Sequence, residues 1–400
     1  MKNQRFRLFL TLFLDTPTTV KFALGVLVGM AFSIAVILST MGLMDGFGFA
    51  LKMGLKRASG EVVMTEKNGR FFQLSDKIKE NFHSQKIDRY AALVQTESFL
   101  IFNEDSKGVL VRGVDETYPE VVELPLVLSE SGVAIGSELA KMNKISIGDE
   151  VVLALAKGNT ELKSMPSLER FRVEKIINHG VYQKDSRLIY VKLSRLQTIL
   201  GLGGSVNAIS FNFPHQSRFS DDIEKIEMLL PDIRDAFGYE FNFKPYWREF
   251  SALLEAVQVE KMMISLILQM IVVISIFNIL AFIIFINEKK SKELFLFKAL
   301  GLSKKAMSDL WIKLVLLIWA LSCLLSMVFV QIFKFALLEL SLFELPGEIY
   351  YMPRIELYLT TSDYLFVFAL SLAWIMLITY YLLRRLRQKS LLEGLRQEFA

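Results

Sequence analysis

The sequence predicts a membrane protein with four transmembrane α-helices and a large α+β domain inserted between helices 1 and 2. Two observations lead to this fold class. Of the 400 residues, 52% are hydrophobic, which is typical of a membrane protein with a substantial water-soluble part. The apolar residues are concentrated in four long segments, whereas residues 45–261 contain no segment that could span a bilayer.

The first apolar segment runs from Phe22 to Met44 without a charged residue, and it follows a basic N-terminal segment, residues 1–21. Basic residues before an apolar run are also typical of a signal peptide. This run is too long for a signal peptide, however, and it ends without a small-residue cleavage pattern. We therefore expect residues 22–44 to be retained as transmembrane helix 1.

Residues 45–261 alternate between short β-rich runs and turn signals, and they contain six of the nine prolines. This length is sufficient for an independently folded α+β domain, with one or two lobes. Strands are predicted at 61–64, 90–102, 108–114, 149–155, 171–177, 187–193 and 207–213. Helices are predicted at 74–83, 137–142, 193–200 and 221–230.

The remaining chain is predicted to contain helix 2 (262–287), helix 3 (311–334) and helix 4 (364–383). They are separated by the loops 288–310 and 335–363 and followed by the tail 384–400. Basic residues collect at the N-terminus, in 288–305 and in the tail. The positive-inside rule places these three segments, and both chain ends, in the cytoplasm, so the large domain lies outside.

Several kinds of chemistry are missing from the sequence. There is no phosphate-binding loop, no zinc-protease motif and no nucleophile elbow, so we expect no enzyme activity and no cofactor bound by this chain. The lone Cys323 cannot form an internal disulfide, and the three histidines lack ligand spacing. The formal net charge of +4 gives no indication of a nucleic-acid partner. The spans hold no buried ionisable residue of the kind that ion-coupled carriers use.

The segment 288–303 is both basic and strongly apolar. Two interpretations fit it: an amphipathic helix lying on lipid, or a helix that docks in a groove of a soluble cytoplasmic partner.

The stretch KKSKELFLFKALGLS (289–303) resembles the cytoplasmic loop of the FtsX/MacB-like permease superfamily, with the pattern E-K-x-x-[DE]-I-A-I-L-K-x-[LM]-G. Glu293, Lys298, Leu300 and Gly301 match it, while 294–296 are bulkier than the usual I-A-I. VRGVD (111–115) resembles the R-G-[IV]-D of the superfamily. Further similar stretches are STMGLMDGFGFALKMGLKRASGEVVM (39–64), GVAIGSELAKMNKISIGDEVVL (132–153) and EGLRQE (393–398).

Within this superfamily the chain is most similar to the lipoprotein-releasing (LolC/LolE-type) permeases. Its outer domain is too large for the cell-division branch, and no ATPase is fused to it as in the macrolide-exporter branch. The resemblance implies a bacterial inner-membrane protein that works with ABC ATPase subunits, on which ATP and Mg are bound. The other implied partners are a second permease, a lipoprotein substrate, membrane lipid and a periplasmic lipoprotein chaperone.

The resemblance also implies three sets of site residues. The ATPase-coupling set is Glu293, Leu294, Phe297, Lys298, Ala299, Leu300 and Gly301. The chaperone hook, in the loop 157–171, is Met165, Pro166 and Ser167, although an ordinary polar hairpin also fits. The lipoprotein acyl-chain lining is Phe32, Val36, Leu43, Met44 and Phe47 of helix 1 with Met263, Ile267, Met270 and Ile274 of helix 2, although plain helix packing also fits.

The predicted function is that of a permease subunit that extracts lipoproteins from the inner membrane and passes them to the chaperone. Two alternatives remain: an FtsX-like mechanotransmitter that regulates a cell-wall hydrolase, and a MacB-like exporter of amphiphiles. Co-purification with a hydrolase would favour the first alternative, and co-purification with an external tunnel protein would favour the second.

Overall fold

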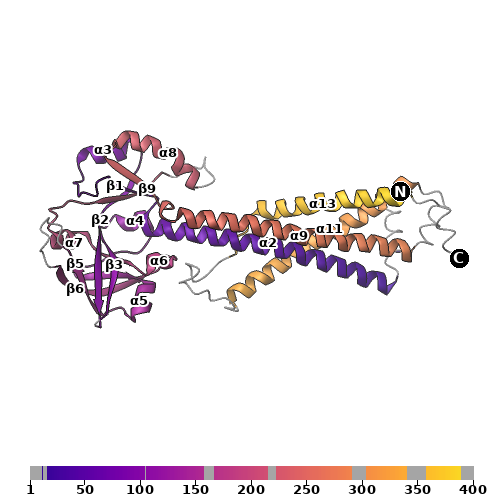
Figure 1. Ribbon diagram of the computed structural model, residues 1–400, viewed down its shortest axis with the longest axis horizontal. Coiled ribbons are helices and arrows are strands. Elements are labelled where there is room, and N and C mark those ends of the chain that lie inside the picture. The colour runs from indigo at the N-terminus through magenta and orange to yellow at the C-terminus, as the bar shows by residue number, and fades with distance from the viewer. Residues whose placement is uncertain are drawn as a thin grey trace. The chain divides into compact units, whose positions relative to one another are not determined.

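The computed structural model of the chain is shown in Figure 1. The residues that it describes are 11, 16–103, 105–156, 166–214, 222–290, 303–339 and 357–388. They form two compact units. The helical unit comprises 1–47, 255–343 and 356–400, and the sheet unit comprises 48–254 and 344–355.

The helical unit is built from four long helices: α2 (Pro17–Ser59, whose last part belongs to the sheet unit), α9 (Ser251–Lys289), α11 (Lys304–Glu339) and α13 (Thr361–Gln388). Among the described residues, three helices are long and apolar enough to cross a membrane, at Pro17–Ser59, Lys305–Leu337 and Thr361–Tyr381. The second predicted span, 262–287, lies within α9. The membrane class is thus confirmed, and the number of four spans stays a prediction.

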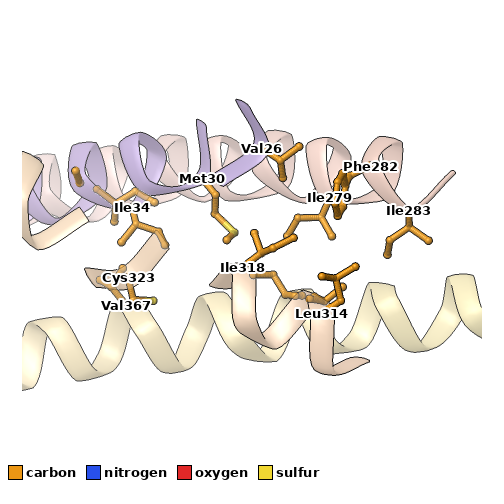
Figure 2. Close-up of a cluster of buried hydrophobic side chains, with 14 of the residues drawn as sticks. Val26, Met30, Ile34, Ile279, Phe282, Ile283, Leu314, Ile318, Cys323 and Val367 are labelled. Atoms are coloured by element: carbon orange, nitrogen blue, oxygen red, sulfur yellow. The ribbon is translucent and has the colours of Figure 1, made fainter. Parts of the chain in front are cut away.

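Apolar side chains from all four helices form the core of this unit (Figure 2). They include Val26, Met30 and Ile34 of α2, Ile279, Phe282 and Ile283 of α9, Leu314, Ile318 and Cys323 of α11, and Val367 of α13. A polar contact adds to this packing. The hydroxyl of the buried Ser322 in α11 donates a hydrogen bond to the carbonyl oxygen of Leu27 in α2 at 3.0 Å. Hydrogen bonds of this kind are typical between helices in lipid.

The sheet unit contains a nine-stranded sheet, with the order β3-β7-β4-β6-β5-β2-β8-β1-β9 and a further pairing of β3 with β2. Its strands are β1 (Val62–Glu66), β2 (Arg89–Phe102), β3 (Asp105–Val114), β4 (Gly132–Gly136), β5 (Glu150–Leu155), β6 (Ser167–Ile177), β7 (Leu188–Lys192), β8 (Ala208–Asn212) and β9 (Phe241–Pro245). The pairing of β2 with β3 closes six strands into a barrel. The long β2 also carries the extension β8-β1-β9, since its first residues, 89–93, pair with β8.

Side chains along a barrel strand point alternately into the barrel core and away from it. In β5, Val151, Leu153 and Leu155 are buried, while the residues between them are partly exposed. Short helices complete the unit: α3 (Asp76–Ser84), α4 (Tyr118–Val122), α5 (Ser137–Asn143), α6 (Tyr182–Asp185), α7 (Leu193–Leu200), α8 (Asp222–Phe237) and the single 3₁₀ turn η1 (Arg248–Phe250).

All of the predicted strands and helices of this unit are present, but the prediction that the helix at 221–230 ends before Pro231 was wrong. Helix α8 continues through Pro231 to Phe237. The reason is tertiary packing, because Ile233 and Phe237 of the added turns are buried, and the Phe237 ring lies 4.7 Å from that of Phe82 in α3.

Gly136, at the end of β4, provides a test of this packing. A Cβ atom there would lie 2.7 Å from the carbonyl carbon of Asp185, so Gly136→Ala should lower the free energy of unfolding by about 1–3 kcal/mol. Thermal unfolding of the purified full-length protein in detergent measures this change. The matched control is Gly108→Ala in β3, where nothing lies within 4 Å. Equal melting temperatures for the two variants would contradict the packing described here.

Candidate functional site: the α2 junction

The last turns of α2 lie within the sheet unit, and their carbonyl groups need hydrogen-bond partners because a helix end leaves them unpaired. Gly60, with φ +73°, ends the helix in the left-handed conformation, and its N–H donates to the Lys56 carbonyl oxygen at 2.7 Å. The hydroxyl of Ser210 donates to the Ser59 carbonyl oxygen at 2.6 Å. We call the residues around this helix end the α2 junction; they are Gly54, Ala58, Gly60, Glu61, Arg112, Tyr118, His179, Asp185 and Tyr190.

Arg112 of β3 is buried beneath the helix end. Its Nη1 donates to the carbonyl oxygen of Ala58 and, at 3.3 Å, to the hydroxyl oxygen of Tyr118, while Nε donates to Gln95 at 3.0 Å. Burial acts to lower the pKa of Arg112, but the phenol groups of Tyr118 and Tyr190 raise it above its ordinary value. A charged guanidinium at a helix C-terminus also interacts favourably with the helix dipole.

The segment 111–115, VRGVD, contains two more residues with defined roles. At Gly113 a Cβ atom would lie 2.9 Å from Leu196 of α7, so the helix can approach the strand only over a glycine. The carboxylate of Asp115 accepts hydrogen bonds from the N–H and the hydroxyl of Thr117, at 3.0 and 2.7 Å, just before α4. The VRGVD motif therefore has structural roles: Arg112 caps α2 at the α2 junction, Gly113 lets α7 approach β3, and Asp115 holds the residue before α4.

A second buried network contains His179, Asp185 and Tyr190. His179 Nδ1 lies 2.6 Å from Asp185 Oδ1, and Nε2 lies 2.8 Å from the Tyr190 hydroxyl. Asp185 also accepts the backbone N–H of His179 at 2.9 Å. Burial raises the pKa of Tyr190 well above its ordinary value, so its hydroxyl stays protonated. His179 is therefore a core histidine, and the described residues contain no group of three that could hold a metal ion.

Helix α2 rests directly on this second network. A Cβ atom at Gly54 would lie 2.5 Å from Val181 Cγ2 and 2.8 Å from the His179 carbonyl oxygen. Gly54 therefore allows the helix to contact the backbone of 179–181.

The charged groups of the junction are paired. One carboxylate oxygen of the buried Glu61 lies 2.9 Å from the ammonium groups of both Lys56 and Lys225. Its other oxygen accepts a hydrogen bond from the N–H of Phe213 at 2.7 Å. Burial acts to lower the pKa of Lys56, but Glu61 and then Asp222 raise it above its ordinary value. With every one of these groups occupied by structural contacts, the junction is suited to holding a helix rigidly and not to reacting with a substrate.

The three predicted sets of site residues lie elsewhere. Glu293, Leu294, Phe297, Lys298, Ala299, Leu300 and Gly301 fall outside the residues that the structure describes, and so does Met165. Pro166 is exposed, and Ser167 is the first residue of β6.

The residues predicted to line acyl chains occupy different surroundings on the two helices. On α9, Met263, Ile267, Met270 and Ile274 have 58–70% of their surface exposed, and their spacing puts them on one face. On α2, Phe32 is 51% exposed, with its ring 6.3 Å from that of Phe329. Val36 packs against the helical core, and Leu43, Met44 and Phe47 are half-buried.

Sequence reasoning did not identify the α2 junction as a site. The available signals were the VRGVD motif and the glycines at 54 and 60, but the partners Tyr118, His179 and Tyr190 come from distant parts of the chain.

A family of known proteins matches the C-terminal part of the chain. Residues 265–391 match the family model described as FtsX-like permease C-terminal. This match covers about a third of the chain and includes α11 and α13, so this part of the chain is similar to FtsX-like permeases.

The whole chain is similar to named lipoprotein-releasing proteins. It is 20% identical to the lipoprotein-releasing system transmembrane protein LolC of Xylella fastidiosa strain Temecula1, over 93% of each chain. It is 22% identical to LolC of Neisseria meningitidis serogroup B strain MC58, over 69% of this chain and 68% of that one. These similarities confirm the resemblance to LolC/LolE-type permeases.

Similarity to solved structures is weaker. The periplasmic region of MacB from Actinobacillus actinomycetemcomitans has a TM-score of 0.32 and 14% identity, covering 50% of this chain and 95% of that one. The extracellular domain of YknZ from Gram-positive bacteria has a TM-score of 0.30 and 14% identity, covering 46% of this chain and 99% of that one. Scores of this size do not establish a common fold.

Replacing Arg112 tests the junction. Arg112→Met removes the donors to Ala58 and Gln95 and the positive charge at the helix end, so the free energy of unfolding should fall by about 2 kcal/mol. Amide hydrogen exchange at 55–60 should rise, and the melting temperature should fall. The control is Arg195→Met, which removes a half-exposed ion pair with Glu169 and should cost less than about 1 kcal/mol. Unchanged exchange at 55–60 in Arg112→Met would argue against its capping role.

Proposed function

We propose that the chain is the permease subunit of an ABC transporter that extracts lipoproteins from the bacterial inner membrane and passes them to a periplasmic chaperone. ATP hydrolysis is supplied by separate ATPase subunits, and a second permease, identical or paralogous, completes the pore. The observation that carries this proposal is the similarity to LolC over nearly the whole chain, which includes both the helical and the sheet unit.

The proposed topology has four membrane helices, with both chain ends in the cytoplasm and the sheet unit in the periplasm. The ion pair between Asp45 of α2 and Lys261 of α9 supports the proposed ends of the first two spans. Asp45 directly follows the first apolar segment, and Lys261 directly precedes the second. Their contact therefore places the end of one segment and the start of the other at the same level.

Removing acyl chains from lipid costs about 0.8 kcal/mol for each CH₂ group, and a transient apolar surface reduces this cost. The exposed stripe Met263, Ile267, Met270 and Ile274 of α9 is suited to this role. Methionine is unbranched and adaptable, so it can pack against acyl chains in several arrangements.

The proposed chaperone contact lies around the β5–β6 connection. Phe99 of β2, Ala154 of β5 and Leu168 of β6 are register neighbours, and Phe99 and Leu168 are 58% and 63% exposed. This apolar surface next to Pro166 supports a docking region for a soluble protein.

A mechanotransmitter that regulates a cell-wall hydrolase is the second candidate, and the rigid α2 junction favours it because such a protein must transmit force outward. Depletion of the protein separates the two functions: mislocalised lipoproteins support release, whereas normal sorting with defective cell-wall cleavage supports the alternative.

The proposed coupling segment is tested by Glu293→Lys and Gly301→Trp. If 293–301 contacts the ATPase, each change should reduce lipoprotein release by at least about tenfold, which corresponds to a loss of roughly 1.4 kcal/mol, while the permease remains inserted. Release from spheroplasts to added chaperone is the measurement. Ser291→Ala, at a position that varies in the family pattern, is the control and should release normally. Normal release by both variants would exclude this segment as the coupling element.

The proposed hook is tested by replacing residues 160–165 with a Gly-Ser linker of equal length. Chaperone binding in a pull-down should be lost if these residues engage the carrier. The same replacement at 216–220, between β8 and α8, is the control and should bind normally. Retained binding by the 160–165 variant would show that these six residues, Met165 included, do not engage the chaperone.

A further inference from the structure

The short helix α6 and the residues just before it, 179–185, contact helix α2 and the turn η1, which leads into α9. We call this segment the α6 clasp. On one side it supports α2, because a Cβ atom at Gly54 would lie within 2.8 Å of both the Val181 side chain and the His179 carbonyl oxygen.

On its other side the α6 clasp contacts the residues that lead into α9. Lys184 Nζ lies 2.6 Å from Glu249 Oε2 and 5.3 Å from the centre of the Phe250 ring. Both partners belong to η1, which directly precedes Ser251, the first residue of α9.

The α6 clasp is itself fixed to the barrel. Asp185 is held by His179, which in turn contacts Tyr190 of β7, and the Asp185 carbonyl lies over Gly136 of β4 with no room for a side chain between them. One short segment therefore connects α2, the beginning of α9 and two barrel strands.

The contact between Lys184 and Glu249 differs from an ordinary surface ion pair. The Lys184 side chain is only 11% exposed, although that of Glu249 is 69% exposed. Burial and then the nearby charge of Arg112 lower the pKa of Lys184, whereas Glu249 acts to raise it. A buried cation beside a second cation depends on its counter-charge, so loss of Glu249 should displace Lys184 and free the start of α9.

We infer that the α6 clasp makes the sheet-unit ends of α2 and α9 move as one body, with Lys184 and Glu249 as the positioning residues of this coupling. The inference builds on the proposed function, in which movement of these helices drives lipoprotein release. Without the contact, α9 can move while the barrel does not follow, so ATP is hydrolysed without release.

A charge swap tests the inference. In the complex purified through a tag on this chain and reconstituted in proteoliposomes, Glu249→Lys and Lys184→Glu should each reduce the lipoprotein released per ATP hydrolysed by at least about fivefold, the lower end of a typical coupling between sites. The double variant restores opposite charges and should recover most of the loss. Swapping the exposed pair Lys192 and Glu130, 2.8 Å apart in the same unit, is the control and should change nothing.

A second measurement separates the clasp from the proposed function. Glu249→Lys should increase amide hydrogen exchange at 251–258, and the double variant should reverse the increase. If the wild-type complex releases no lipoprotein, the proposed function fails, and hydrogen exchange alone decides on the clasp. The inference would be overturned if amide hydrogen exchange at 251–258 in Glu249→Lys equalled that of the wild type. It would also be overturned if the double variant showed no more recovery than the single variants.

Discussion

The buried contact between Arg112 and the carbonyl oxygen of Ala58 is the constraint on which the sheet unit depends. A long helix that ends inside a protein core brings unpaired carbonyl groups with it, and these destabilise the fold unless donors meet them. A guanidinium provides several donors and a charge that complements the helix dipole. The Tyr118 hydroxyl, Ser210 and the N–H of Gly60 then complete the cap, so the carbonyl groups of Ala58, Ser59 and Lys56 are all hydrogen-bonded.

This arrangement suits a protein that must transmit movement. A helix held by its own backbone groups cannot turn or slide without breaking several buried hydrogen bonds together, whereas a helix held by flexible surface side chains can. The α6 clasp adds a second support at Gly54, one to two turns before α2 ends at Ser59. On its other side the same segment contacts η1, the turn that precedes α9.

Much of this architecture was predictable from the sequence. The uncharged run from Phe22 to Met44 lies within α2, and α7 has the predicted bounds, because apolar periodicity and length are local signals. Strand β4 was missed because all five of its residues are buried, so it shows no alternation, and α6 is too short for any period. The pairings of β3 with β7 and of β2 with β5, which complete the barrel, join strands far apart in the chain, and so does the contact of Arg112 with Ala58. No local pattern encodes such contacts.

The place of β1 within the sheet has a consequence for biosynthesis. This strand directly follows α2, yet it pairs with β8 and β9, which come more than a hundred residues later in the chain. An emerging chain therefore delivers β1 first and must wait for nearly the whole unit before this part of the sheet can form. Such long-range pairing folds slowly, so the β8-β1-β9 part of the sheet is completed only after β9 has been made, shortly before α9 follows.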